Sequence, residues 1–332
     1  MRRIRIKGVN DMKEYAFGID LGGTTAKVGL FTTSGKLLEK WEVSTDTSNN
    51  GAHILENLAA AVQQKMQEKG LSADEVEGVG LGVPGPVLDS SIVPIVCANL
   101  GGWGERNVSI QLSGLLDGIK VLVGNDADVA ALGEIWMGCA KGCRSAVMVT
   151  LGTGVGGGVV LNGKLLTGCN GAAAELGHFV IDMHGKECNC GMRGCFEQYG
   201  SVTALICQAR EAMAAHKESK LWALAENEEA NVNGKVILAA YDAGDETAVQ
   251  VVNTYVHYLC IGVTSIINIF QPEVLCLGGG ISRRSDVLVE PIRAFNAAHG
   301  YGRSCPKQPR IMSAELFGDA GIIGAALLGK GK

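Results

Sequence analysis

The strongest constraint on the fold of this chain is an internal repeat. The segment "IDLGGTTAKVGLFTTSGKLL" begins at Ile19, and "VTLGTGVGGGVVLNGKLL" begins at Val149, about 130 residues later. Each copy contains an apolar strand, an LG turn followed by small residues, a second strand and a GKLL exit. The dipeptides SG and NG before the two exits are typical of hairpin turns. We therefore predict a duplicated chain with two α/β halves.

The segments between and after the repeats predict further elements of the same kind. Helical periodicity covers "HILENLAAAVQQKMQEKG" and "VTALICQAREAMAAHKE". Short apolar runs that end in Gly or Asp predict buried strands at "VEGVGLGV", "IKVLVGND" and "EVLCLGGG". We expect the ligand-binding loops at the ends of these strands.

Composition indicates a globular protein of about two domains. The 332 residues are 47% hydrophobic and 19% charged, which allows a sizeable core. The formal net charge is −5, with 29 basic and 34 acidic residues in no long block. This balance argues against a nucleic acid or a membrane surface as the main partner. Small neutral or anionic ligands remain open.

The sequence also carries features that bear on location. The N-terminal stretch "MRRIRIKGVNDMKEY" is basic but has no apolar region after it, so we do not expect a secretory signal. Apolar runs such as "CIGVTSIINIF" are shorter than the ~18 residues that a membrane helix needs. We expect a cytoplasmic protein.

Glycine-rich turns are the first candidate binding elements. The letters "GTGVGG" from Gly152 fit G-x-G-x-x-G, but a strand and not a helix follows, so a dinucleotide fingerprint is excluded by context. A Walker-type loop is absent from the sequence. What remains is one Gly/Thr-rich turn in each half, whose backbone N–H groups and hydroxyls can approach the phosphates of one nucleotide. Asp20 could orient a water on phosphate-bound Mg²⁺. Two plain hairpins are the alternative.

A cysteine cluster is the second candidate site. Three of the eleven cysteines lie in "CNCGMRGC", and in a reducing compartment a dense cluster indicates a metal more often than a disulfide. Cys188, Cys190 and Cys195, with His178 as a fourth ligand, suit tetrahedral zinc in a closed, structural site. His184 is a weaker candidate for the fourth position. A coincidental group of free thiols is the alternative.

The candidate catalytic carboxylate lies in "VLVGNDADVAALGEIWMG". Asp126 falls where a buried strand ends and an apolar-periodic helix begins, so the helix dipole favours its ionised form. An ionised carboxylate can accept a proton from an alcohol. Alternatively, Asn125 or Asp126 is only the cap of that helix.

Together these segments resemble the ROK family (repressor, open reading frame, kinase) and most closely its bacterial glucokinases. The resemblance runs from "GIDLGGTTAKVGL" through "GVPGP", "NLGGW", "GNDADVAALGE", "LGTGVGGG", "AAELGHFV" and "CNCGMRGCFE" to "LGGGIS". It implies an actin-like, ribonuclease H-like duplicated fold with a cleft for ATP·Mg²⁺ and a hexose between two α/β domains. It also implies ATP-dependent formation of glucose 6-phosphate, which feeds glycolysis. We expect a smaller domain at residues 1–125 plus 310–332 and a larger one at 126–309.

The resemblance assigns roles to single residues. Asp126 matches the general base. The sugar-binding positions are matched by Asn99, Asn125, Asp126, Glu175, His178 and Glu197. The residues matched to nucleotide and Mg²⁺ binding are Asp20, Gly22, Gly23, Thr24, Thr25, Gly152, Thr153, Gly154, Gly156, Gly157, Gly278 and Gly279. The structural zinc ligands are matched by His178, Cys188, Cys190 and Cys195.

Other activities and assemblies remain open at this stage. The same ligand set would suit a kinase for N-acetylmannosamine, N-acetylglucosamine or fructose. A sugar-responsive repressor is disfavoured, because only about fifteen residues precede the first strand and no basic recognition helix is evident. From the resemblance alone we expect a homo-oligomer, either a dimer or a tetramer, that binds neither nucleic acid nor membrane. The sequence does not distinguish ATP from other nucleotides or polyphosphate as donor.

Overall fold

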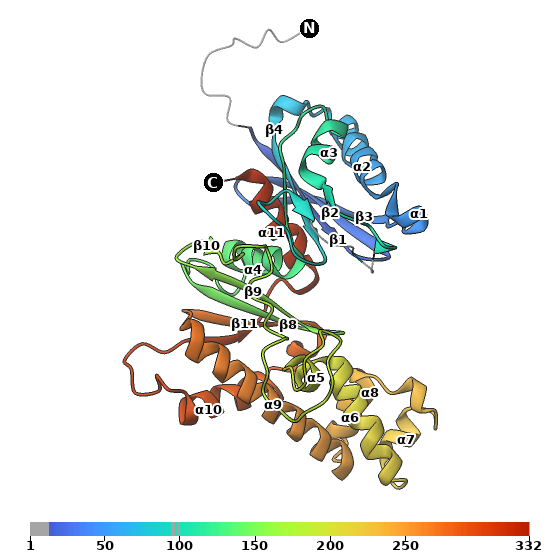
Figure 1. Cartoon of the computed structure of the whole chain (residues 1–332), viewed down its shortest axis with the longest axis vertical. Coiled ribbons are helices and arrows are strands. Elements are labelled where there is room, and N and C mark those ends of the chain that lie inside the picture. The colour runs from blue at the N-terminus through green and yellow to red at the C-terminus, as the bar shows by residue number, and fades with distance from the viewer. Residues whose placement is uncertain (1–12, 94–96, 98–99, 332) are drawn as a thin grey trace. The chain divides into compact units, whose positions relative to one another are not determined.

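The structure is a computed structural model that describes residues 13–93, 97 and 100–331. The chain forms two compact units, which are labelled by element in Figure 1. Unit 1 comprises Met1–Asp126 with Gly321–Lys332, and unit 2 comprises Ala127–Ala320. Each unit contains one five-stranded sheet together with helices, so both halves are α/β.

Unit 1 is built on a sheet with strand order β3-β2-β1-β4-β7. The strands are β1 (Tyr15–Leu21), β2 (Thr25–Thr32), β3 (Leu37–Ser44), β4 (Val76–Val83) and β7 (Val121–Asn125). The first three form an antiparallel meander, whereas β4 and β7 run parallel to β1. The other elements are α1 (Ser48–Gly51), α2 (Ile54–Lys69), η1 (Ala73–Glu75), β5 (Ile92–Val93), β6 (Arg106–Asn107), α3 (Val108–Leu115) and most of α11 (Ala320–Lys330).

Unit 2 has a sheet with strand order β10-β9-β8-β11-β12. The strands are β8 (Ala146–Leu151), β9 (Val155–Leu161), β10 (Lys164–Leu165), β11 (Val274–Gly278) and β12 (Arg310–Ser313). The longer helices are α4 (Asp126–Met137), α6 (Val202–Ala215), α8 (Gly234–Asp242), α9 (Glu246–Phe270) and α10 (Val289–His299). The shorter ones are α5 (Glu197–Gly200), α7 (Lys220–Leu224), η3 (Glu229–Asn231), η4 (Gly280–Arg283) and η5 (Phe317–Asp319).

The duplication predicted from the repeat is confirmed by the two sheets. In unit 2, β8, β9 and β10 form an antiparallel meander, and β11 and β12 run parallel to β8. This is the strand order and direction of β1, β2, β3, β4 and β7 in unit 1. The quoted repeats supply the same three antiparallel strands of each sheet. The fold is therefore a duplicated α/β fold of the actin-like, ribonuclease H-like kind.

The chain returns to unit 1 later than the expected boundary at residue 310. Strand β12 pairs in parallel with β11, so residues 310–313 belong to the second sheet. The return begins at Gly321, within α11. A Cβ at Gly18 would overlap the carbonyl of Ile322, and one at Gly80 would overlap that of Ala325. Glycine in β1 and β4 thus lets α11 lie directly on the first sheet.

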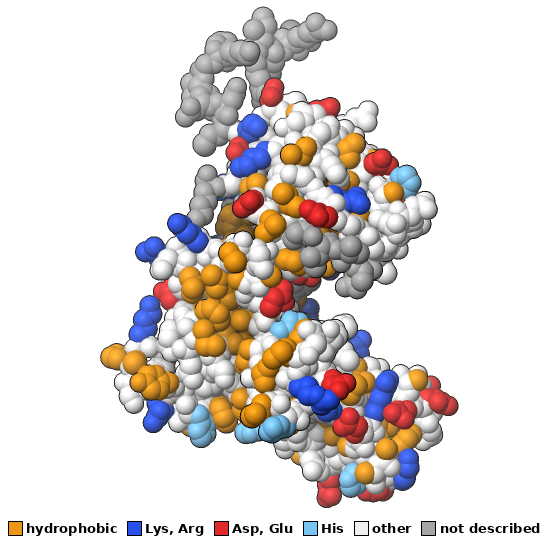
Figure 2. Space-filling model, viewed as in Figure 1, with side chains coloured by type: hydrophobic (Ala, Val, Ile, Leu, Met, Phe, Trp, Pro, Cys, Tyr) orange, Lys and Arg blue, Asp and Glu red, His pale blue; other side chains and the backbone are white. Residues whose placement is uncertain are grey.

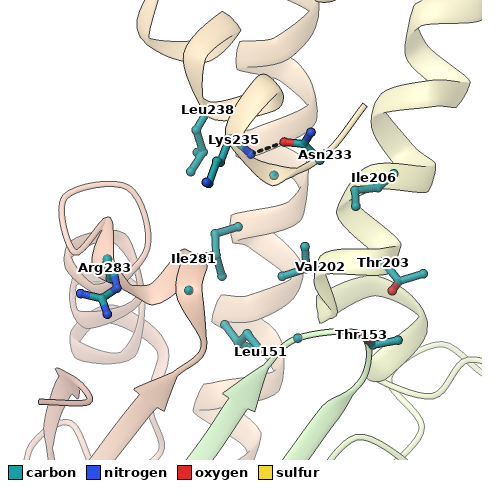
Figure 3. Close-up of a pocket in the computed structure, with 13 residues that line it drawn as sticks. Leu151, Thr153, Val202, Thr203, Ile206, Asn233, Lys235, Leu238, Ile281 and Arg283 are labelled. Atoms are coloured by element: carbon teal, nitrogen blue, oxygen red, sulfur yellow. Dashed lines mark hydrogen bonds between the residues drawn. The ribbon is translucent and has the colours of Figure 1, made fainter. Parts of the chain in front are cut away.

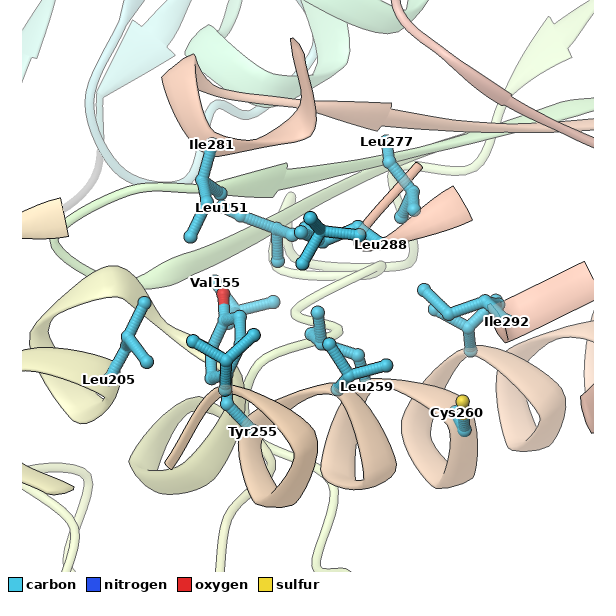
Figure 4. Packing of buried hydrophobic residues seen from close by; sticks show 14 of the residues in the cluster. Leu151, Val155, Leu205, Tyr255, Leu259, Cys260, Leu277, Ile281, Leu288 and Ile292 are labelled. Carbon is cyan, nitrogen blue, oxygen red and sulfur yellow. The ribbon is translucent and has the colours of Figure 1, made fainter. Parts of the chain in front are cut away.

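A long central helix supports the functional loops of unit 2. Helix α9 begins at Asp245, whose side chain accepts a hydrogen bond from the N–H of Ala248 and caps the helix. Figure 4 shows Tyr255 and Leu259 of α9 facing Leu151 and Val155 from the sheet. Because Leu151 and Val155 flank the turn between β8 and β9, this buried packing fixes the base of that turn.

On the face drawn in Figure 2, acidic and basic side chains are interspersed over both units and do not gather by sign. Among the helices that the structure describes, none combines the length and hydropathy required to cross a membrane.

Candidate active site

The first glycine-rich turn connects β1 and β2 in unit 1. The N–H of Gly22 donates to the carbonyl of Thr25 at 3.2 Å. Thr45, which follows β3, holds the turn from the side: its hydroxyl donates to the carbonyl of Gly22 at 2.8 Å and its N–H donates to that of Thr24 at 2.9 Å. Thr24 is exposed and Gly23 is partly buried. The turn is therefore fixed by three hydrogen bonds to its carbonyl groups, one of them from a side chain, while its tip stays accessible.

Two carboxylates lie at one edge of the same sheet. Asp20 is near the carboxyl end of β1, and Asp126 begins α4 directly after β7, as predicted. Strand β4 lies between β1 and β7 and all three are parallel. Burial raises the pKa of Asp20, the charge of Asp126 raises it further, and Lys27 acts in the opposite direction. Asp20 and Asp126 are thus within electrostatic reach of each other.

The predicted sugar residue Asn125 is positioned by the preceding loop. Its Nδ2 donates to the carbonyl of Gly85 at 3.1 Å, which joins the end of β7 to the "GVPGP" segment after β4. Asn125 is partly buried and Asp126 is exposed. Asn99, the other sugar residue expected in this unit, lies outside the described residues.

The second glycine-rich turn connects β8 and β9 in unit 2. The N–H of Gly152 donates to the carbonyl of Gly154 at 3.0 Å. The N–H of Val202, the first residue of α6, donates to the carbonyl of Gly152 at 2.9 Å. Gly152 and Thr153 are exposed. This turn therefore rests on the start of α6 and presents its first two residues to solvent.

Glu197 contacts this second turn directly. Its Oε2 accepts a hydrogen bond from the N–H of Val155 at 2.9 Å. A Cβ at Gly154 would overlap the same oxygen, so the carboxylate lies against the glycine. The N–H of Glu197 donates to the carbonyl of Gly177 at 2.8 Å. A residue expected to bind sugar thus also holds the turn expected to bind phosphate, a link that the sequence did not indicate.

The later glycines of the repeat lie within strand β9 and pack against protein. A Cβ at Gly156 would press on the hydroxyl of Thr150 at 2.5 Å. A Cβ at Gly157 would overlap the carbonyl of Ala174 and the side chain of Leu176. These two positions need glycine because other parts of unit 2 approach the strand closely.

A cavity of about 710 Å³ opens beside the second turn, entirely within unit 2. Figure 3 shows the apolar side chains of Leu151, Val202 and Ile281 converging from β8, α6 and η4. Lys235 and Arg283 bring cationic groups from two other directions. The full lining is Leu151, Gly152, Thr153, Val202, Thr203, Ile206, Asn233, Gly234, Lys235, Leu238, Gly280, Ile281 and Arg283. Its size and its mixture of apolar walls with a few polar groups are typical of a small-molecule site.

Sequence reasoning found only part of this cavity. It identified Gly152 and Thr153, and the quoted segment "LGGGIS" contains Gly280 and Ile281, whereas the residues from α6 and α8 carry no recognisable motif. The sequence also indicated Gly278 and Gly279, but in the segment after β11 the first residue that lines the cavity is Gly280. Gly278 is buried at the end of β11, and Gly279 has a φ of +92°, with a Cβ there overlapping the carbonyl of Leu151. Gly279 therefore makes the turn that places Gly280 and Ile281 at the cavity.

The cysteine cluster is assembled as predicted. Four potential metal-ligand atoms lie within 4.8 Å of one another, one each from His178, Cys188, Cys190 and Cys195. The Cys188 sulfur lies 3.6 Å from Nδ1 of His178, and the Cys190 and Cys195 sulfurs are 3.6 Å apart. His184 is not in the group. Burial raises the pKa of Cys195 to about 12, while the backbone N–H of Met192 lowers that of Cys190.

These four residues fit tetrahedral zinc. Zinc–sulfur bonds of about 2.3 Å and zinc–nitrogen bonds of about 2.0 Å place neighbouring ligand atoms roughly 3.5–3.8 Å apart. The two 3.6 Å separations match this spacing. Gln198 donates to the Cys188 sulfur at 3.5 Å, which is the kind of outer contact that orients a thiolate ligand. Within the described part of the chain, this is the one His/Cys/Asp/Glu group with such spacing.

The same backbone carries the expected sugar residues of unit 2. The N–H of His178 donates to the carbonyl of Glu175 at 3.0 Å, so Glu175 and His178 share a tight turn. The segment from Cys195 to Glu197 lies beside this turn, because Phe196 donates to the carbonyl of Phe179 at 2.9 Å. Glu175, His178 and Glu197 are therefore held on one scaffold with the cysteine cluster.

Comparison with known proteins adds independent findings. The model of the ROK family matches residues 16–332. The chain is 38% identical to a glucokinase of Halalkalibacterium halodurans, with 94% of each chain covered. It is 36% identical to a glucokinase of Thermotoga maritima over 93% of this chain and 95% of that protein. The structure of a ROK family glucokinase from Streptomyces griseus, in complex with glucose and AMPPNP, superposes with a TM-score of 0.78 at 31% identity, covering 96% of this chain and all of that one.

Proposed function

Because this chain belongs to the ROK family, we propose that it is a glucokinase, which transfers the γ-phosphoryl group of ATP to the 6-hydroxyl of glucose. The observation that carries the proposal is the identity of 36–38% to two glucokinases over more than nine tenths of the chain. The likeness to a solved ROK glucokinase that holds glucose and AMPPNP supports the same substrates.

On the donor side, we assign the nucleotide base and ribose to the cavity of unit 2. The apolar side chains of Leu151, Val202 and Ile281 suit the faces of adenine, and its volume of about 710 Å³ is sufficient for a nucleoside. The exposed residues Gly152 and Thr153 then face the phosphates, and the N–H and hydroxyl of Thr153 are the proposed donors on that side. The turn Gly22–Thr25 is the corresponding phosphate-binding element of unit 1.

On the acceptor side, the proposed glucose ligands are Asn125, Asp126, Glu175, His178 and Glu197. Asp126 accepts or orients the proton of the 6-hydroxyl as phosphoryl transfer proceeds. Its place as the first residue of α4 supports this role, because a helix N-terminus stabilises a carboxylate. Asn99 completes the proposed sugar set.

Two metals belong to the proposal. Mg²⁺, when bound with ATP, offsets phosphate charge in the reaction, and the nearby carboxylate of Asp20 is suited to orient its water ligands. Zinc would be held by His178, Cys188, Cys190 and Cys195. With Nδ1 of His178 on the cluster side, Nε2 is left for a sugar hydroxyl. Zinc would then be structural, and its effect on catalysis would act through the position of the sugar residues.

The cellular setting is proposed from the family resemblance. We propose a cytoplasmic homo-oligomer, a dimer or a tetramer. Size-exclusion chromatography with light scattering measures the assembly directly.

The test of the proposed function is steady-state kinetics with ATP and a panel of glucose, fructose, N-acetylmannosamine and N-acetylglucosamine. We expect kcat/KM for glucose to exceed that for each other sugar by at least about tenfold, since hydroxyl-binding sites reject analogues that leave polar groups unpaired. A higher kcat/KM for an N-acetylated sugar or for fructose would assign the enzyme to that substrate. Absence of phosphorylation of all four would refute kinase activity on these hexoses.

A further inference from the structure

A second group of thiols lies in unit 2, in a small apolar cluster on the α4 side of its sheet. The Cys139 and Cys276 sulfurs are 2.7 Å apart, whereas a covalent S–S bond is about 2.0 Å. Both side chains are buried, at 6% and 1% exposure. Cys143 is partly buried and packs against the same cluster. The buried pair and the more exposed Cys143 therefore belong to one small cluster, at different depths from the surface.

The turn that carries two of these thiols is held firmly. Buried Glu134 accepts a hydrogen bond from the N–H of Cys139 at 2.9 Å through its carboxylate. Glu273, just before β11, accepts from the N–H groups of Arg144 and Ser145 at 2.7 and 3.1 Å. The turn after α4 is thus fixed to the strand that carries Cys276, so the short sulfur separation belongs to an ordered part of the fold.

The depth of each thiol determines the order in which it can react. The hydrogen bond with Cys139 and burial both raise the pKa of Cys276, so this thiol is the weakest first nucleophile toward a small disulfide and reacts last. Cys143 is the most accessible of the three. Arg310 donates to the Cys143 sulfur at 3.2 Å and holds the side chain in place.

We propose that this group is an oxidation site, at which a low-molecular-weight disulfide converts Cys139 and Cys276 into an intramolecular disulfide, with Cys143 as the point of entry. Cys143 attacks the small disulfide RSSR, forms a mixed disulfide and releases one RSH with the proton that it loses. Cys139 attacks the Cys143 sulfur and releases the second RSH. Cys276 then attacks the Cys139 sulfur, and its proton passes to the regenerated Cys143 thiol. Two protein thiols lose two electrons and RSSR is reduced to two RSH.

The experiment treats the zinc-loaded, folded protein with oxidised glutathione, blocks the remaining thiols by alkylation and maps the peptides without reduction by mass spectrometry. We expect a linked pair of peptides that contain Cys139 and Cys276, which dithiothreitol separates. Cys143→Ser should slow formation of this link by at least about tenfold, because the buried thiols are then reached only by local opening. Cys207→Ser is the matched control: Cys207 is exposed on α6 outside the cluster, and its loss should leave the rate unchanged.

Specific outcomes would overturn the proposal. Three results would each show that the buried pair is not oxidised. Glutathione could stay bound to Cys143, the reaction could stop at a disulfide between Cys139 and Cys143, or Cys139 and Cys276 could both be recovered as alkylated thiols. An unchanged rate in Cys143→Ser would refute the entry point. Cys276→Ala should abolish the link, with circular dichroism to verify its fold. If that variant fails to fold, Cys139→Ala removes the other thiol of the pair, which lies in the turn after α4, and should also abolish the link.

Discussion

Alanine at Gly154 is expected to weaken the use of glucose while the fold is retained. A Cβ at this position overlaps Oε2 of Glu197, far inside ordinary contact distances of about 3.5 Å. The overlapping atom is the end of a flexible side chain, and Gly154 does not have a positive φ, so neither the backbone nor the core has to move. The carboxylate of Glu197 must therefore shift, by about 1 Å or more.

The magnitude follows from the contact that is lost. After such a shift, Oε2 no longer accepts the 2.9 Å hydrogen bond from the N–H of Val155. A hydrogen bond to a charged group contributes about 1.5–3 kcal/mol, and this loss lowers the stability of the turn, because the bond lies within the protein. A misplacement of about 1 Å in a catalytic site costs up to about 100-fold. We expect kcat/KM for glucose to fall about 10- to 100-fold, mainly through a higher glucose KM.

The matched control is Gly152→Ala in the same turn, because a Cβ at Gly152 meets nothing within 4 Å. Thermal unfolding by circular dichroism should give the wild-type midpoint for Gly152→Ala and a midpoint lower by several degrees for Gly154→Ala, which stays folded but loses the hydrogen bond to Val155. Initial rates with varied glucose and varied ATP then separate the two substrates. The reasoning is refuted if Gly154→Ala raises the KM for ATP and leaves that for glucose unchanged, since Gly154 would then be needed by a phosphate and not by Glu197.

Three further predictions test the remaining assignments. Asp126→Asn should lower kcat by at least about 100-fold, which is within the range expected for the loss of general-base catalysis, and should change glucose affinity little. Near-normal turnover would show that Asp126 is only a helix cap. Cys190→Ser should lose zinc, measured by elemental analysis against one zinc per wild-type chain, and raise the glucose KM at least about tenfold with nucleotide binding unchanged. Burial and the charge of Asp126 raise the pKa of Asp20 above its ordinary 3.8. The folded state therefore binds the proton of the Asp20 carboxyl group more tightly than the unfolded state does, and the protein loses stability as the pH rises from 3.8 through the higher pKa of the folded state. Asp20→Asn should therefore unfold at a higher temperature than the wild type at pH 7, and the difference should vanish at pH 3; an Asn variant less stable at pH 7 would contradict this.

The elements that the sequence predicted correctly are those with strong local signals. The apolar run "VEGVGLGV" is β4, Val76–Val83, and the second repeat contains β8 and β9 on either side of its turn. The cluster with His178 was predicted from the spacing of the cysteines, because thiolate ligands on one short loop lie close together without contacts from distant parts of the chain. In these cases composition, periodicity and turn residues all point to the same structure.

Features set by tertiary contacts were not accessible in the same way. Strand β12 is short and partly exposed, so nothing local places residues 310–313 in the second sheet. The cavity depends on α6 and α8, whose N-terminal residues Val202 and Asn233 meet only after folding. Asn233 did carry a signal as a helix cap, since its side chain accepts from Lys235 and Val236, but a cap does not reveal what the helix end faces.

Glycine shows most clearly why sequence and structure give different information. A Gly-rich turn is compatible with phosphate binding, but glycine is equally required wherever two parts of the protein approach closely. In the second repeat, Gly152 faces open space, Gly154 lies against the carboxylate of Glu197, and Gly157 lies against the backbone of Ala174. Only the first of these has room for a ligand at its Cβ position. The other two make the turn fit against the segment that carries the proposed sugar and zinc ligands. Glu197 therefore joins the proposed phosphate loop to the segment that carries the sugar and zinc ligands, because it contacts the turn and lies two residues from Cys195.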